Sequence, residues 1–119
     1  METLDLAFQL IIALGILNVW LLRYGAETEY RGGDARNMSE EFAVYGLPSW
    51  SVPVIGSMKV LLAVLLILGL WLPEFTQPAA VGLAIFMTGA VVMHIKVRDS
   101  IKKTVPALAM LVLCVLTAV

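Results

Sequence analysis

The sequence predicts an all-α integral membrane protein, a bundle of four transmembrane helices with a short amphipathic surface helix in its first loop. Of its 119 residues, 61% are hydrophobic and only 14% are charged, whereas soluble domains are about half apolar and about a quarter charged. The apolar residues gather in four runs, and each has about the 20 helical residues that a hydrocarbon core about 30 Å thick requires. We therefore expect one transmembrane domain over residues 1–119.

The four apolar runs are predicted to be helices because backbone groups in lipid must find their hydrogen bonds within the segment. Prolines lie near the predicted helix ends, as at Pro73 between the second and third runs, which fits the poor tolerance of helix interiors for proline. The predicted spans are about residues 4–22, 52–72, 79–97 and 101–119.

The first connection contains a predicted surface helix at about residues 38–45. In "NMSEEFAVYGLP", Asn37 and Glu40 have the spacing of a capping box, and Gly46 provides a stop. One side of this helix is apolar and the other is acidic, so we expect it to lie on the membrane surface. The stretch before it, "GAETEYRGGDAR", is polar and glycine-rich and is predicted to be a flexible connection.

The distribution of basic residues predicts an orientation in the membrane. Seven of the eight Lys and Arg residues lie in the first and third connections, and none lies at either end of the chain or in the second connection. Basic loops face the cytoplasm in most membrane proteins. Loops 1 and 3 are therefore predicted to be cytoplasmic, with both termini outside.

The eighth basic residue, Lys59, lies within the second apolar run. A lysine at the centre of a membrane helix costs about 2.5 to 3.5 kcal/mol on insertion scales. Gly56 and Ala63 share its helix face, and such small residues favour close helix packing that turns Lys59 into the bundle. One interpretation is a functional site. The other is a lysine that reaches the cytoplasmic interface or forms a structural ion pair.

Four further polar residues are predicted to lie near Lys59 at the cytoplasmic mouth of the bundle. His94, the only histidine, falls near the inner end of the third helix and suits a proton relay or a hydrogen bond to a small ligand. An interfacial histidine with no ligand is the alternative. Asn18 from the first helix, and Glu40 or Glu41 from the surface helix, complete the candidate ligand-binding cluster.

The sequence predicts no catalytic residue and no metal ligand set. A single histidine and the single cysteine, Cys114, do not make a bis-histidine haem site or a zinc site. A charge of −1 and the lack of a basic tract with interleaved aromatics argue against a nucleic-acid partner. Gly82 and Gly89 lie seven residues apart on one face and predict a packing surface for a helix of this chain or another.

Three stretches resemble the DoxX-like family of small four-helix membrane proteins. They are "EEFAVYGLPSW", "IGSMKVLLAVLLILGLWLP" and "AAVGLAIFMTGAVVMHIKVRDSIKKTVPALAMLVLC". The resemblance covers most of the chain from about Glu40 onward. It implies a bundle in the bacterial inner membrane and a loose association with respiratory complexes, quinones or the maturation of other membrane proteins. It assigns no role to Lys59 or His94.

Three functions follow as hypotheses. The first is a non-catalytic accessory or assembly subunit of a membrane complex, whose partners would be the lipid bilayer and another membrane protein or a second copy. The second is a quinone-linked redox protein in which Lys59 and His94 hold the ligand, with quinone as the only cofactor candidate. The third is a small proton-coupled transporter, which needs a relay group near the membrane midplane.

Overall fold

The computed structural model describes residues 3–22, 25 and 31–119, and within them every regular element is a helix. The all-α prediction is thereby confirmed. Part of the predicted flexible connection, residues 26–30, lies outside the described residues. The elements are α1 (Thr3–Leu17), the π-helical turn η1 (Asn18–Leu22), α2 (Met38–Val44), α3 (Ser51–Leu68), the 3₁₀ turn η2 (Pro73–Phe75), α4 (Thr76–Lys96) and α5 (Ile101–Ala118).

In the described part of the chain, three helical segments are long and apolar enough to cross a membrane: Ser51–Leu68, Pro73–Lys96 and Ile101–Ala118. A fourth apolar helix, Leu6–Leu22, is shorter and combines α1 with η1. Many large hydrophobic side chains of these segments are exposed, among them Ile85 and Val112, which suits contact with lipid chains.

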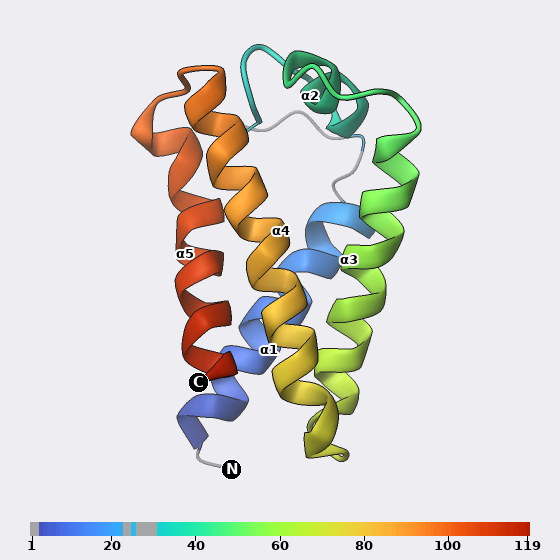
Figure 1. Ribbon diagram of the computed structural model, residues 1–119, viewed down its shortest axis with the longest axis vertical. Coiled ribbons are helices and arrows are strands. Elements are labelled where there is room, and N and C mark those ends of the chain that lie inside the picture. The colour runs from blue at the N-terminus through green and yellow to red at the C-terminus, as the bar shows by residue number, and fades with distance from the viewer. Residues whose placement is uncertain (1–2, 23–24, 26–30) are drawn as a thin grey trace.

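Helices α3, α4 and α5 run along the long axis of the molecule, and α1 crosses behind them (Figure 1). The short η2 turn makes α3 and α4 an antiparallel pair. Helix α2 covers one end of the bundle together with the loop between α4 and α5 (Figure 1). The start of α1, the η2 turn and the end of α5 lie at the opposite end (Figure 1).

The tightly packed part of the bundle is the half away from α2. Leu66 of α3, Leu83 of α4 and Cys114 of α5 are fully buried there. Alanines let the helices approach closely. Ala63 and Ala80 are both completely buried in this core.

Helix α2 begins where its capping residues predict. The Asn37 side-chain oxygen accepts a hydrogen bond from the Glu40 backbone N–H at 2.9 Å, which satisfies a free donor of the first turn. After the helix, Gly46 has a φ of 80°, a left-handed conformation that favours glycine. Phe42 of α2 packs edge-to-face on Trp20 with ring centroids 5.9 Å apart, so the apolar face of α2 points into the bundle.

Candidate ligand-binding site

Under α2 the helices enclose a cavity of about 740 Å³, a size typical of small-molecule sites. Its walls come from all five α-helices and η1, and most of the side chains are apolar. The large apolar and aromatic ones include Ile16, Trp20, Phe42, Ile55, Phe86, Met87, Met93 and Met110. A cavity of this kind accommodates an extended apolar molecule.

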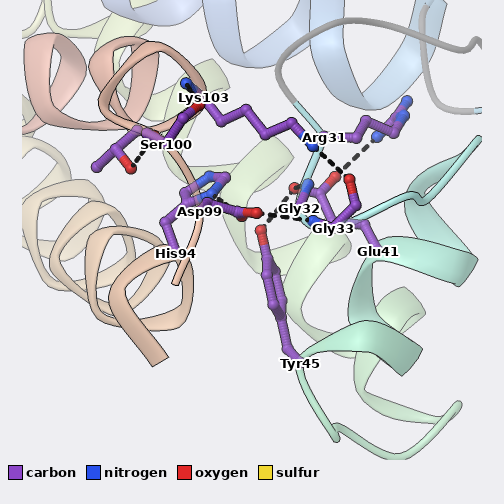
Figure 2. A network of polar contacts seen from close by, with 10 residues as sticks. Arg31, Gly32, Gly33, Glu41, Tyr45, His94, Asp99, Ser100 and Lys103 are labelled. Carbon is purple, nitrogen blue, oxygen red and sulfur yellow. Dashed lines mark hydrogen bonds and ion pairs between the residues drawn. The ribbon is translucent and has the colours of Figure 1, made fainter. Parts of the chain in front are cut away.

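The end of the cavity under α2 is polar, and Glu41 organises one half of it (Figure 2). The Glu41 carboxylate accepts hydrogen bonds from Arg31 Nη1 at 3.0 Å, from the Tyr45 hydroxyl at 2.7 Å and from the Gly32 backbone N–H at 3.2 Å. The Arg31 side chain is only 5% exposed, so Glu41 neutralises a buried cation. Burial, and then the nearby Glu41 carboxylate, raises the pKa of Tyr45 above its ordinary value, so its hydroxyl stays a donor.

Asp99 organises the other half of the polar end (Figure 2). Its Oδ2 lies 2.7 Å from His94 Nδ1, and its Oδ1 accepts the Gly33 backbone N–H at 3.0 Å. Lys103 Nζ donates to the Gly33 carbonyl, so both backbone groups of this glycine are held by the loop after α4 and the start of α5. Arg98, with a left-handed φ of 57°, makes the turn that brings Asp99 back beside His94.

The two halves of the polar end touch each other. The Tyr45 ring packs edge-to-face on the His94 ring with centroids 5.9 Å apart. In addition, Lys96 Nζ donates to the Tyr45 carbonyl at 2.8 Å. The loop before α2, α2 itself and the loop after α4 therefore form one connected polar network over the cavity.

Lys59 differs from the other cations of the site because its ammonium group makes no hydrogen bond or ion pair with any residue that the structure describes. It is 8% exposed, and its Nζ lies 5.5 Å from the centroid of the Trp20 ring. This cation–π contact and an electrostatic interaction with Glu41 compensate part of its charge. Among the described side chains, only Gln9 Oε1 and Thr117 Oγ1 are sealed from solvent without a partner. Lys59 Nζ is therefore reachable from the cavity that its residue lines.

The polar network and most of the cavity lie in the part of the chain that matches a protein family. The DoxX-like family matches residues 30–117. The chain belongs to the DoxX-like family. No curated protein and no solved structure matches the chain. The family match confirms the resemblance predicted from the sequence. Together with the three long apolar helices, it indicates a small membrane protein.

Four of the five predicted site residues line the cavity of this DoxX-like protein: Asn18, Glu41, Lys59 and His94. Asn18 lies in the π-helical turn and is largely exposed, so it forms part of the rim. Glu40 is exposed and is absent from the cavity wall. Its side chain instead accepts a hydrogen bond from Asn37 Nδ2 at 2.8 Å.

The four small residues predicted for helix packing lie in different surroundings. Gly56 is buried under the Trp20 ring, and Ala63 is completely buried in the core. A Cβ atom at Gly82 would lie 2.9 Å from Leu62. Gly89 is exposed and lines the cavity, and a Cβ atom there would meet open space.

Sequence reasoning missed Arg31, Tyr45, Asp99 and Lys103 as members of the site. The positions of the loop cations in the sequence indicate only an orientation in the membrane, and Tyr45 is predicted only to lie in the surface helix at about residues 38–45. One signal for Asp99 is present in the sequence. Asp99 follows His94 by five residues, and this spacing lets a residue just beyond the end of a helix fold back onto the last turn of that helix.

Proposed function

We propose that this protein binds a quinone in the cavity under α2. The proposal depends on one observation: a cavity with mainly apolar walls contains a buried ammonium group, on Lys59, that has no hydrogen-bond acceptor among the described residues. A quinone ring offers carbonyl oxygens that accept such a bond, and its prenyl tail suits apolar walls. Hydrogen bonds that involve a charged group contribute about 1.5 to 3 kcal/mol.

The surroundings of Lys59 suit a flat ring. Trp20 from η1, Phe42 from α2 and Phe86 from α4 contribute aromatic surface to the walls. Exposed residues also belong to the lining, among them Val19 in η1 and Ile85 on α4. The cavity therefore opens onto the outer surface of the helices, where an apolar tail can continue among lipid chains.

The location that fits this function is the bacterial inner membrane, with four spans. The apolar helix Leu6–Leu22 has 17 residues, about 26 Å at 1.5 Å per residue, which is near the lower limit for a crossing. The basic loops before α2 and after α4 would then face the cytoplasm. In this placement the polar end of the cavity lies on the cytoplasmic side, where protons are exchanged with water.

The other two functions stay predictions. A quinone-binding protein without a redox centre of its own would act beside an electron-transfer partner, so the accessory role is compatible with the proposal. A proton-coupled transporter would also use His94 and Lys59, but its ligand would cross the membrane. Both differ from the proposal in what a purified, quinone-loaded protein would do.

Lys59→Met tests the proposal because methionine keeps the length and apolar stem of the side chain and removes the donor. The measurement is titration of purified protein in lipid nanodiscs with a short-chain benzoquinone, read by calorimetry and by extraction of co-purified quinone with mass spectrometry. We expect the dissociation constant to rise at least tenfold, the equivalent of losing one charged hydrogen bond.

Lys102→Met is the matched control, because Lys102 is exposed and does not line the cavity. This variant should bind like the original protein. Thermal unfolding shows whether either variant is folded. Equal quinone affinity in folded Lys59→Met and in the original protein, or a protein that binds only lipid, would overturn the proposal and favour the accessory function.

A further inference from the structure

The Asp99 carboxylate fixes which nitrogen of His94 carries the proton, and this has a consequence for ligand selection. We infer that Asp99, acting through His94, makes the site prefer the hydroxyl-bearing form of its ligand, the hydroquinone, over the quinone. The inference rests on the proposed function and adds a specificity to it. Asp99 acts only through His94, without contact to the ligand, and is therefore a positioning residue.

Asp99 is held so that it can only accept from His94. Its side chain is 5% exposed, and its two oxygens have different partners. Oδ1 accepts the Gly33 backbone N–H at 3.0 Å, and Oδ2 faces His94 Nδ1 at 2.7 Å. An ionised carboxylate has no proton to donate. The short contact therefore requires the proton of the imidazole to lie on Nδ1.

With that proton on Nδ1, a neutral His94 presents a lone pair at Nε2. This nitrogen has no hydrogen bond to any residue in the described part of the chain. It is not among the sealed atoms without a partner, although His94 as a whole is only 5% exposed. Since His94 lines the cavity, Nε2 is open to a ligand there, and it requires a donor.

Lys59 has the opposite requirement, because an ammonium group donates and never accepts. The two open groups of the cavity, His94 Nε2 and Lys59 Nζ, therefore complement a ligand with one hydroxyl donor and one oxygen acceptor. A hydroquinone has both. A quinone has two carbonyl acceptors, and at His94 it would place an oxygen lone pair against a nitrogen lone pair.

Asp99→Asn tests the inference because asparagine has the shape of aspartate, but an NH₂ group, which donates, replaces one of the two carboxylate oxygens. The Gly33 N–H can only donate, so the amide oxygen stays at the Oδ1 position. The amide NH₂ group then faces His94 Nδ1, which must accept. The imidazole proton moves to Nε2, which becomes a donor, and the preference should shift toward the quinone.

The measurement is anaerobic calorimetric titration at pH 7.5, where histidine side chains are ordinarily mostly neutral. The protein is purified and placed in nanodiscs, and the probes are a mono-prenyl dimethoxybenzoquinone and its chemically reduced hydroquinone. The original protein should bind the hydroquinone about tenfold more tightly than the quinone, since one unpaired buried polar group accounts for a factor of this size. Asp99→Asn should abolish or reverse that ratio.

Asp34→Asn is the matched control, since Asp34 follows Gly33 and is exposed. It should keep the preference of the original protein. His94→Phe is a second variant that keeps ring packing against Tyr45 and removes Nε2, and it should lose the preference even where Asp99→Asn does not fold.

The outcomes separate the inference from the proposed function. Equal affinity for both forms in the original protein, or an unchanged preference in folded Asp99→Asn or His94→Phe, would overturn the inference and leave quinone binding intact. Failure of both forms to bind would overturn the proposed function and the inference together. A preference for the hydroquinone that disappears in Asp99→Asn supports both.

Discussion

At the end of the bundle that contains the η2 turn, the helices pack on alanines and branched apolar side chains, whereas under α2 the same helices enclose a cavity of about 740 Å³. Leu66 and Leu83 at the packed end are fully buried. At the α2 end, the buried side chains include the charged Arg31 and Lys59. The same helices therefore form a packed apolar core at one end of the bundle and a cavity with buried charges at the other.

The difference teaches how a small membrane protein makes room for a polar site. Lipid chains are as apolar as a protein core, so helix association depends on close packing and hydrogen bonds. The packed end provides that packing. The α2 end is held together instead by side chains that bind loop backbone, such as Asp99 and Lys103 on Gly33. These contacts lie over the cavity, so the helices below them are held without closing the space between them.

The largest effect on stability should come from breaking the charge network of the α2 end. Glu41→Ala removes one carboxylate that pairs with the buried Arg31, and it removes the acceptor of the Tyr45 hydroxyl. Loss of one partner of a buried ion pair costs about 3 kcal/mol. We expect a lower melting temperature in detergent and faster proteolysis of the loop before α2.

Glu40→Ala is the control for that prediction. Glu40 lies next to Glu41 in the sequence, but its side chain is exposed and bonded to Asn37. Its loss should cost at most about 0.5 kcal/mol, as for most exposed positions. Equal destabilisation by the two variants would mean that Glu41 does not neutralise a buried charge.

A smaller effect should separate two glycines that sequence reasoning treats alike. A Cβ atom at Gly56 would lie 2.5 Å from the Trp20 ring, whereas at Gly89 it would meet open space. Gly56→Ala should cost about 1 to 2 kcal/mol through overpacking. Gly89→Ala should stabilise the helix by about 0.5 to 1 kcal/mol. Thermal unfolding of the two variants side by side measures the contrast, and a stabilised Gly56→Ala would contradict the close packing of η1 on α3.

The sequence was sufficient for the helical class and the family because both depend on local pattern. Apolar runs predict helices, and Asn37 with Glu40 marks the start of α2. The site was harder to predict because it depends on contacts between distant segments. Gly33 meets Asp99 across 66 positions, and no periodicity encodes this contact.

Exposure was the second quantity that pattern could not supply. The sequence places Asn18 in the candidate cluster with Lys59 and so predicts that it turns toward the bundle. In the structure Gln9 is 1% exposed and Asn18 is largely exposed on the cavity rim. A helical wheel gives the angle between two residues, but the direction of the core follows from the neighbouring helices. Here the buried residues of the first helix, Gln9, Ile12, Ile16 and Trp20, follow one another at spacings of three and four and so form one face, and Asn18 lies on the opposite side.

Gln9 provides the smallest predicted effect, at the packed end. Its Nε2 donates to the Leu66 carbonyl at 3.3 Å and to Thr76 Oγ1 at 3.1 Å, and so joins α1 to both ends of the α3–α4 turn. Its Oε1 is buried without a partner among the described residues. Gln9→Leu removes two hydrogen bonds and also one unsatisfied oxygen, so the two changes offset each other in part.

We expect Gln9→Leu to lower the free energy of unfolding by only about 0.6 kcal/mol, the average for hydrogen bonds between membrane helices. Asn18→Leu, at the exposed rim, should be neutral in the same assay. A loss several times larger for Gln9→Leu would show that the packed end depends on polar anchoring as much as the α2 end does. The contrast between the two ends of the bundle would then be one of charge alone, because both ends would be held by buried hydrogen bonds.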